Sequence, residues 1–570
     1  MRDLESWNRV ISRYFCRFSC IGLLSLVNCE GNLLEQSIEI PDGKVSAEIN
    51  SKAEARSEAV HNQAVIPISE AMEPADSGAT SANNEGSVAT TDVVESANQD
   101  SGEDFDMEAD PQQEELLVEL PNTPPIDMPM ERLTEEATYY VDAVGGDDAS
   151  DGTTKATAWK SLAKVKATSL QPGDIVEFYG DFGSQLLLPN VHGTAEKPIV
   201  FRGAIDETTG AKPHMGGIIM SDATHLDFSD FDLSGDRMLV YLSVSSDADA
   251  SIHYLRFFRI NMHDARRGIQ LTRDKVAWDK YFVKEEIPLH QVDDRISDIS
   301  FYNSTIHNMT EDGVMLNDNT GNRFSYIGGS IGTTGTIKGM RLNKDGTKTP
   351  FAQHGVYASG GHGHLFDGIH FYDNKDGATI SIRRGDITVR NCFFEGKTGL
   401  TLYNEDEGVE GAMNLGYYIY RNTFKLDGDA FYQGGDGDYG VPDPGNTIYI
   451  YNNTFIQNSP TSRGIAQGGR TSIVENFDSY IFNNLFVGLK IAQKAPINGH
   501  VHVISHNAFV DGGVASGTAS LSDDPGLTGE FKVTSSAYVD AGVADIAPGL
   551  VLKPNIDYSG NAPDIGATER

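Results

Sequence analysis

Cysteine is scarce in this chain, and its four residues are unevenly placed. Cys16, Cys20 and Cys29 lie near the N-terminus, and Cys392 is the single cysteine of the C-terminal two-thirds. Exported domains that are stabilised by disulfides carry paired cysteines within the fold. The folded part must therefore rely on its hydrophobic core, and we expect Cys392 to be a small buried side chain rather than a nucleophile.

Basic residues are also few. The 570 residues contain 44 Lys and Arg against 82 Asp and Glu, a formal net charge of −38. Most of this excess lies in residues 30–136, where 26 acidic residues stand against 4 basic ones. Charge of this sign disfavours nucleic acid as a partner. Because the same segment has only scattered hydrophobic residues, which cannot offset its ordering entropy, we expect 30–136 to be a disordered acidic linker.

The first 29 residues have only a short apolar run. Arg9, Arg13 and Arg17 precede the apolar residues 21–27, a pattern typical of an export signal, with an apolar run too short to span a bilayer as a mature helix. Residues 26–29 resemble the cleavage box of bacterial lipoproteins, with Asn28 where that box prefers a small residue. The resemblance implies lipidation of Cys29 and an anchor in the outer membrane. Without lipidation, we expect a secreted or periplasmic protein.

A phrase of β-branched and aromatic residues, an Asn and a Phe recurs through the C-terminal half. Its Asn residues, separated by three steps of 31 residues and one of 23, are Asn391, Asn422, Asn453, Asn484 and Asn507. Upstream coils are matched at Asp230, Arg259, Asn303 and Asp367. A fixed period of strand-forming residues, punctuated by Gly and Asn, favours a β-solenoid. We expect each repeat Asn to adopt left-handed backbone at a turn and to hydrogen-bond the Asn of the next coil.

The two ends of the repeat region support this interpretation. Residues 139–142 and 175–178 read as strands, and residues 158–166 read as a helix with Trp159, Leu162 and Val165 on one face. Together with the closing residues 557–567, they resemble the caps of right-handed parallel β-helix proteins of the pectate-lyase-like type, many of them exported enzymes that act on polysaccharides. The resemblance covers about residues 138–570. It implies an all-β domain over 137–570, a single-stranded right-handed parallel β-helix with a short N-terminal capping helix.

A second phrase, a polar residue followed by Gly and alternating apolar residues, reads as a short strand in each coil. The resemblance implies that this strand row carries the substrate cleft. If the phrases stack in register, the residues before each Gly form a solvent-facing row of Arg267, Asp312, His354, Asp376 and Thr398. The second row is then Gln270, Met315, Tyr357, Thr379 and Thr401. The third row is Thr272, Asn317, Ser359, Ser381 and Tyr403, flanked by Arg273 and Arg383. Segments 273–298 and 332–352 exceed the minimal coil, and we expect them to form walls of the cleft.

Two reactions suit this stripe. The first is β-elimination from a uronate polymer, which needs a base near the sugar C5 proton, an acid for the leaving oxygen and a cation for the carboxylate. His354 and Tyr357 suit the base and the acid, and Arg267 or Arg383 suits the cation. We favour this lyase because an Arg, His and Tyr group suits an anionic polymer, although the negative charge of the chain counts against it. The candidates for substrate binding are Arg273, Arg383, Asn317 and Tyr403.

The second reaction is inverting glycoside hydrolysis by Asp312 and Asp376, which two coil steps would hold about 9–10 Å apart. Outside the enzymes, the alternative is a non-catalytic carbohydrate-binding or adhesin-type β-helix. We expect no metal site, because the histidines within 362–370 match no standard ligand set. Residues 374–377 lack the doubled Asp of calcium-dependent β-helix lyases, so we expect no cofactor, with calcium as the weaker alternative. We expect a monomer whose partner is a polysaccharide.

Overall fold

The computed structural model describes residues 135–567 with internal gaps. These gaps are 245–249, 274–294, 317–321, 343–346, 384, 404–415, 435–446, 461, 468–477, 490, 493–501, 511–519, 523, 529–532 and 545–559. The predicted export signal with Cys29, and the predicted acidic linker up to residue 134, lie outside the described residues. Across the ranges that the structure describes, no helix is long and apolar enough to cross a membrane.

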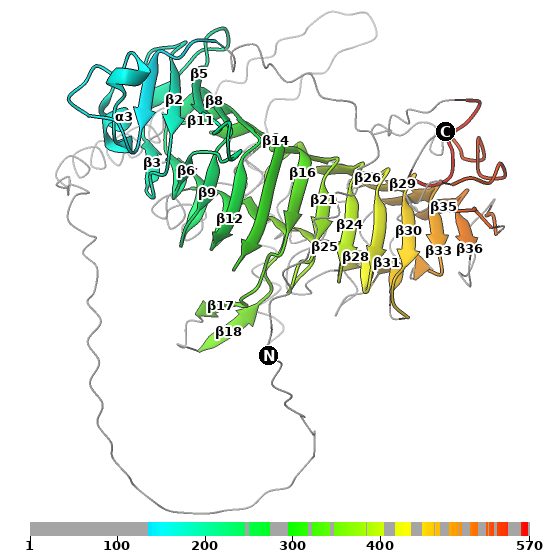
Figure 1. Cartoon of the computed structure of the whole chain (residues 1–570). Helices are drawn as coiled ribbons and strands as arrows, with labels where there is room; N and C mark the ends of the chain where they lie inside the picture. The colour runs from blue at the N-terminus through cyan, green and yellow to red at the C-terminus, as the bar shows by residue number, and fades with distance from the viewer. Residues whose placement is uncertain are drawn as a thin grey trace, which may run out of the picture. The chain divides into compact units, whose positions relative to one another are not determined.

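Almost all of the described chain is β-structure wound into parallel coils. Each strand pairs in parallel with the equivalent strand of the next coil, which produces one 23-stranded and one 11-stranded sheet. In Figure 1 these strands lie side by side from β2 to β36. The 23-stranded sheet has two legs, joined where the long strands β14 (Ile296–Met309) and β16 (Ser325–Gly332) bend from one leg into the other. The structure confirms the predicted parallel β-helix.

The remaining strands fall into four groups. The first leg contains β1 (Tyr139–Asp142), β2 (Ile175–Tyr179), β4 (Val191–His192), β5 (Ile199–Gly203), β8 (Ala223–Ser229), β11 (Ile252–Phe258), β20 (His364–Asp367), β23 (Ile387–Arg390), β26 (Gly416–Tyr420), β29 (Thr447–Tyr451), β32 (Asp478–Phe482) and β35 (His502–Ser505). The second leg contains β6 (His214–Met215), β9 (Asp232–Ser234), β12 (Asn261–Ala265), β21 (His370–Tyr372), β24 (Phe393–Gly396), β27 (Thr423–Leu426), β30 (Thr454–Gln457), β33 (Leu485–Val487) and β36 (Ala508–Val510). The 11-stranded sheet contains β3 (Gln185–Leu188), β7 (Gly217–Met220), β10 (Met238–Val244), β13 (Arg267–Arg273), β15 (Val314–Leu316), β19 (Val356–Ala358), β22 (Ile380–Ile382), β25 (Leu400–Tyr403), β28 (Asp429–Gly434), β31 (Arg463–Gln467) and β34 (Ile491–Ala492). An antiparallel hairpin is formed by β17 (Gly339–Leu342) and β18 (Lys348–Phe351).

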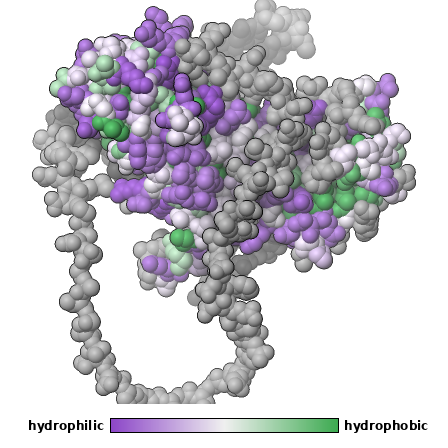
Figure 2. Space-filling model, in the orientation of Figure 1, coloured by the Kyte–Doolittle hydropathy of each residue, from purple (hydrophilic) through white to green (hydrophobic). Residues whose placement is uncertain are grey.

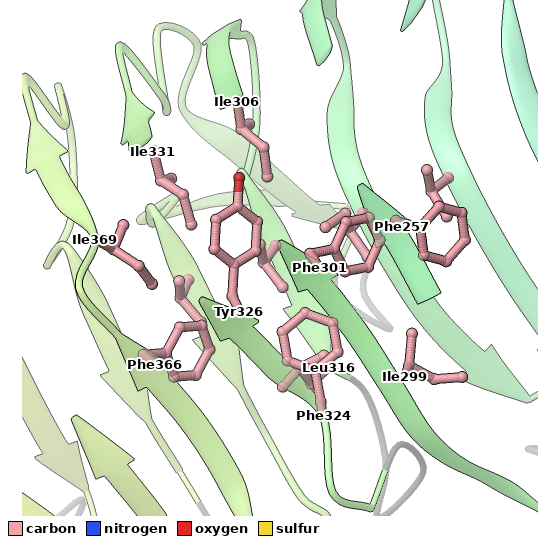
Figure 3. Close-up of a cluster of buried hydrophobic side chains, with 14 of the residues drawn as sticks. Phe257, Ile299, Phe301, Ile306, Leu316, Phe324, Tyr326, Ile331, Phe366 and Ile369 are labelled. Atoms are coloured by element: carbon pink, nitrogen blue, oxygen red, sulfur yellow. The ribbon is translucent and has the colours of Figure 1, made fainter. Parts of the chain in front are cut away.

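The core consists of apolar side chains stacked in rows along the coils. One row, with 4.4–5.0 Å between successive ring centroids, is Phe201, Phe228, Phe257 and Phe301. A second row, with 4.6–4.9 Å between centroids, is Phe371, Phe394, Phe424, Phe455, Phe486 and Phe509. Figure 3 shows part of this interior, where Tyr326 lies beside Phe301 and Ile331. The Tyr326 hydroxyl donates to the backbone carbonyl of Ser304 (2.7 Å), so its one polar group is satisfied inside the core.

The repeat Asn residues form the predicted hydrogen-bonded ladder over four coils. Its buried members are Asn422, Asn453, Asn484 and Asn507. Both the backbone N–H and the side-chain amide of Asn453 donate to Asn484 Oδ1, each at 3.0 Å. The left-handed backbone lies one residue earlier, as at Asn452 (φ 51°) and Asn483 (φ 56°). The two roles that we assigned to one Asn are therefore divided between two consecutive residues.

In the first repeat, the sequence-based prediction put the ladder position one residue too early, at Asn391. Asn391 adopts the left-handed conformation (φ 53°), and Cys392 occupies the ladder position. The backbone N–H of Cys392 accordingly donates to Asn422 Oδ1 at 3.0 Å. Cys392 is buried, as predicted. In the upstream coils the left-handed residues include the predicted Asp230, Arg259 and Asn303, whereas in the coil of Asp367 the left-handed residue is Gly368.

The N-terminal cap has the predicted strands and a shorter helix than predicted. A single 3-10 turn (Lys155–Thr157) precedes helix α3 (Leu162–Ala167). The helix begins late because the Ser161 side chain caps it, accepting a hydrogen bond from a backbone N–H at 3.2 Å. Trp159 therefore lies before the helix, where its ring stacks on Tyr139 with 4.6 Å between centroids. At the other end, the closing residues 560–567 bind the last coils, for example through the Gly566 N–H and the carbonyl of Asn483 (2.9 Å).

Candidate functional site

The predicted stripe lies at the start of successive strands of the 11-stranded sheet. The pairings of β13 with β15 and of β15 with β19 place Arg267, Asp312 and His354 in line, as predicted. The pairing of β19 with β22 then puts Ala378, and not Asp376, beside His354. The predicted place of Asp376 in this row is wrong by two residues, because the turn before β22 is longer than the repeated phrase implied.

The same two-residue shift changes the outer rows. Tyr357 pairs with Ser381 and not with Thr379. Arg383 takes the place in the third row that was predicted for Ser381, in line with Tyr403. A shift by an even number of residues keeps each side chain on the same face of the sheet. The outward face predicted for this strand is therefore preserved, while the neighbours within each row are not.

The first row does not face solvent as we expected. The exposed fractions are 8% for Arg267, 3% for Asp312 and 5% for His354. Buried charged groups need partners, and the neighbouring turns supply them. Tyr357 and Arg383 lie further along their strands and are partly exposed. A ligand on this face would reach these two side chains first.

Arg267 is held by two acidic side chains of the next coil. Its Nη2 lies 2.5 Å from Glu311 Oε2, and its Nε lies 3.5 Å from Asp312 Oδ2. The neighbouring Arg266 pairs with the other oxygen of Glu311 at 2.7 Å. Arg267 is thus committed to internal pairs and is a poor choice as the cation for a substrate carboxylate. Sequence reasoning overlooked Arg266 and Glu311, although two arginines and two acidic residues in register on adjacent coils were a usable signal.

Gln353 is a further residue that sequence reasoning missed, and it is fully buried. Oriented to satisfy its surroundings, its amide nitrogen donates to Asp312 Oδ2 (2.9 Å) and Oδ1 (3.2 Å), and its oxygen accepts from the Gly339 N–H (3.2 Å). Its backbone N–H donates to Asp376 Oδ2 at 3.0 Å, and the next N–H, of His354, donates to Asp312 Oδ1 at 2.8 Å. The carboxylates of Asp376 and Asp312 therefore accept hydrogen bonds from two consecutive backbone N–H groups. A buried Gln beside a candidate acid has no signature in a single sequence.

Burial moves the pKa values of the two central groups in opposite directions. It raises the pKa of Asp312 to about 6, against the opposing attraction of Arg267. It lowers the pKa of His354 to about 4. His354 Nδ1 lies 3.1 Å from the carbonyl of Ala378, which must accept, so Nδ1 carries the proton and Nε2 has the lone pair. At neutral pH the site thus contains a neutral imidazole and a carboxyl that titrates close to neutrality.

The rings of His354 and Tyr357 are stacked, and a cation lies over the second ring. The two ring centroids are 5.5 Å apart with 24° between planes. The Arg383 guanidinium lies 5.8 Å from the Tyr357 centroid. Gly377 makes room for the imidazole, because a Cβ at that position would lie 2.5 Å from ring atoms of His354. An imidazole, a phenol and a guanidinium are therefore contiguous on this face.

The other predicted binding residues are less fully placed. Arg273 pairs with Val244 at the end of β13, and Tyr403 pairs with Gly434 at the end of β25. Their side chains are not described, and Asn317 lies outside the described residues. The segment 332–352 contributes the hairpin of β17 and β18, whereas most of 273–298 lies outside the described residues.

The clustered histidines point to different partners. His362 Nδ1 lies 3.0 Å from Asp386 Oδ1, His364 Nε2 lies 2.8 Å from the carbonyl of Gly360, and His370 Nε2 lies 3.1 Å from Glu395 Oε2. Over the described ranges, no group of three or more His, Cys, Asp or Glu side chains is arranged to hold a metal ion.

Comparisons with known proteins give limited similarity. No family model matches the sequence. A lacto-N-biosidase of Bifidobacterium longum subsp. longum is 40% identical over 78 residues, which are 13% of this chain and 5% of that protein. The chain thus spans only a small part of that relative's length.

Among solved structures, the pectate lyase Pel9A is 16% identical with a TM-score of 0.41, over 76% of this chain and 96% of that chain. A GH136 lacto-N-biosidase from Eubacterium ramulus is 17% identical with a TM-score of 0.30, over 60% of this chain and 68% of that chain. An alginate lyase from a Paenibacillus species is 14% identical with a TM-score of 0.35, over 55% of this chain and 97% of that chain. At this level of similarity they assign neither a family nor an activity to the chain.

Proposed function

We propose that this protein is a polysaccharide lyase that cleaves a uronate-containing chain by β-elimination. The observation that carries the proposal is the contiguous series of the buried His354 and the partly exposed Tyr357 and Arg383 along the 11-stranded sheet. It places a proton acceptor, a proton donor and a cation next to one another. These are the three groups that elimination beside a carboxylate requires.

In the proposed step, Arg383 pairs with the uronate carboxylate and makes the C5 proton more acidic. His354 Nε2 takes that proton, the C5–H electron pair forms the C4–C5 double bond, and the C4–O bond breaks. The Tyr357 hydroxyl gives its proton to the leaving oxygen. Proton exchange with water then restores both side chains. The pKa of His354, about 4 in the free protein, would rise beside a bound carboxylate, because a nearby negative charge favours imidazolium.

Two buried hydroxyls lie beside this series. Ser381 and Thr401 follow Tyr357 on the next two coils. Both hydroxyls are buried and lack a hydrogen-bond partner within the part of the chain that the structure describes. An unpaired buried polar group costs about 1–3 kcal/mol.

The corrected site leaves Arg267 and Asp312 with a supporting role in this reaction. Asp312 accepts the backbone N–H of His354, and Arg267 partly balances the charge of Asp312. The two residues fix the position of the His354 imidazole from the side away from the substrate, and they do not touch the substrate. We class them as positioning residues in the lyase.

Inverting hydrolysis by Asp312 and Asp376 is the second candidate. It is favoured by the pKa of Asp312, about 6, which suits a general acid near neutral pH. Because both carboxylates bind consecutive N–H groups, standard backbone lengths limit their separation to about 10 Å. This limit is compatible with the roughly 6.5–9.5 Å of inverting pairs. What counts against it is that both Asp312 oxygens already accept hydrogen bonds within the protein, from the Gln353 amide and from the His354 N–H.

A polysaccharide of this kind lies outside the cell, in agreement with the predicted export signal. We further propose that the mature chain is a monomer tethered through lipidated Cys29, with the acidic linker as the tether. Metabolic labelling with a fatty-acid analogue should mark the wild-type chain and spare a Cys29→Ser variant. A non-catalytic surface protein that binds carbohydrate is the alternative outside the enzymes.

The test uses the full chain, with polygalacturonate and alginate as anionic substrates and dextran as a neutral one. The lyase should release products that absorb in the ultraviolet through the new C=C bond, and Tyr357→Phe should lower kcat about 100-fold or more with an unchanged melting temperature. Reducing ends without that absorbance would identify the hydrolase. Binding to a polysaccharide without any cleavage, over a broad panel, would overturn both enzyme assignments.

A further inference from the structure

The hairpin of β17 and β18 is the one antiparallel sheet that the structure describes, and it leaves the parallel coils altogether. It interrupts the coil between β16 and β19, and in Figure 1 it stands away from the stacked strands. Its second strand, β18, ends two residues before Gln353. The hairpin therefore emerges directly beside the candidate site.

Large apolar side chains are exposed on this hairpin. The exposed fractions are 60% for Ile337, 55% for Met340 and 45% for Phe351. Figure 2 shows hydrophobic and hydrophilic residues side by side on it. A soluble protein does not normally gather exposed large apolar residues on one projecting element unless that element has a binding partner.

The charge of the hairpin is opposite to that of the whole chain. Residues 336–353 contain Lys338, Arg341, Lys344 and Lys348 against the single acidic Asp345, while the chain has a net charge of −38. Lys338 and Lys348 are both exposed. A local excess of positive charge, on a chain this acidic, indicates a negatively charged partner.

Both sides of the hairpin are fixed to the residues around Asp312. The Gly339 N–H donates to the Gln353 side chain, whose amide nitrogen donates to Asp312. The Ile337 N–H donates to the carbonyl of Thr310 at 3.0 Å, two residues before Asp312. A Cβ on Gly339 would lie 2.1 Å from the Gln353 side-chain amide group, so this close contact needs glycine. The base of the hairpin is therefore continuous with the site.

We propose that this hairpin is a binding arm for the anionic polysaccharide, an inference that rests on the proposed function. The exposed lysines pair with carboxylates of sugar units beyond the cleavage point. Met340, on the same face of the hairpin as Lys348, lies against the apolar faces of the sugar rings, while Phe351 lies on the opposite face, beside Gly339. A hairpin with apolar and basic side chains also suits an anionic lipid surface. The polysaccharide is favoured because the base of the arm is bonded to the candidate site.

The arm is tested in the full chain with two paired substitutions. Lys338→Ser with Lys348→Ser removes the charge, and Met340→Ser with Phe351→Ser removes the apolar surface. The matched control is Lys160→Ser with Lys197→Ser, two exposed lysines of the N-terminal coils. Binding is measured by calorimetry with alginate and polygalacturonate, with dextran as the neutral polymer, and by cosedimentation with phosphatidylglycerol vesicles. All variants also carry Tyr357→Phe, so that any cleavage is slowed.

We expect each hairpin pair to weaken binding of at least one anionic polymer about tenfold, and the control pair to bind as the parent does. The loss in the lysine pair should shrink at high salt. Unchanged affinity in both hairpin variants, or no binding of either polymer by the parent, would refute the proposal that the hairpin binds the polysaccharide. Vesicle binding that depends on the hairpin, without polymer binding, would assign it to a membrane. Hairpin-dependent polymer binding by a wild-type chain that cleaves nothing would leave the arm intact and refute the lyase.

Discussion

The side-chain amide of Gln353 lies 2.9 Å from Asp312 Oδ2 and is bonded on its other side to the N–H of Gly339. The two residues come from adjacent coils, 41 positions apart in the sequence. Through this contact a fully buried amide links the base of the β17–β18 hairpin to a buried carboxyl. Gln353 thus contacts both Asp312 and the base of the hairpin.

Replacing Gln353 by Met should raise the pKa of Asp312 above its value of about 6. The amide donates hydrogen bonds to the carboxylate, and removing donors from the charged form disfavours ionisation. The measurement is an NMR titration of the Asp312 carboxyl, with the exposed Gln171→Met as the matched control. A carboxyl that titrates in Gln353→Met as it does in the parent would show that the contact does not influence the charge.

Asp312 should make the folded state less stable as the pH rises from about 4 to 6. Its folded pKa of about 6 lies above the ordinary value of 3.8 for a free Asp side chain, so the native state binds more protons in this window and the stabilisation present at low pH is lost. The loss amounts to about 3 kcal/mol. Denaturant unfolding of the parent and of Asp312→Asn should show the difference in free energy between them change by this amount. Parallel curves for the two proteins would contradict the expectation.

His354 should act in the opposite direction over an overlapping range. Its folded pKa of about 4 lies below the ordinary value of 6.5 for a free His side chain, so its contribution is fully present above pH 6.5 and is lost as the pH falls to about 4. Relative to His354→Gln, the wild type should lose about 3 kcal/mol of unfolding free energy across this range. NMR of the imidazole nitrogens offers an independent check, because Nε2 should remain unprotonated at pH 5. An imidazolium signal at that pH would refute the assignment.

The Asn ladder should be a main source of stability in the C-terminal coils. The Asn453 amide nitrogen donates to the carbonyl of Ile419 (2.8 Å) and to Asn484 Oδ1 (3.0 Å), and its oxygen accepts two bonds from Asn422. Asn453→Ala would leave several buried groups unpaired, and it should lower the free energy of unfolding by about 3 kcal/mol or more.

The matched control for this ladder prediction is Asn458→Ala in the same coil. Asn458 is exposed and donates to Asp427 at 2.7 Å. Its removal should change the unfolding free energy by less than about 0.5 kcal/mol. Chemical denaturation followed by tyrosine fluorescence reports on these coils, which carry stacked tyrosines. Equal effects of the two substitutions would show that the ladder is not specially stabilising.

Most of the fold could be predicted from the sequence because each coil repeats the same requirement. Every inward Phe must meet a similar side chain in the next coil, as Phe424 meets Phe455, and this leaves a period that can be read directly. The wrong predictions, for Asn391 and Asp376, fall in coils where the repeated sequence phrase has more residues before its strand than the phrase has in the other coils. Asn391 was mistaken for a ladder residue because an Asn stands there, although the stacking of Phe394 on Phe424 assigns that place to Cys392.

The sequence alone determined the architecture and the alignment of Arg267, Asp312 and His354, because strands with a period of two residues can bury their apolar side in only one way. Only the tertiary structure decided which of these groups are buried, that Asp376 falls outside the row, and that Gln353 joins the hairpin to Asp312. Burial and pKa depend on the turns that cover a residue from neighbouring coils. Those turns vary freely in length, and no periodic pattern records where they lie.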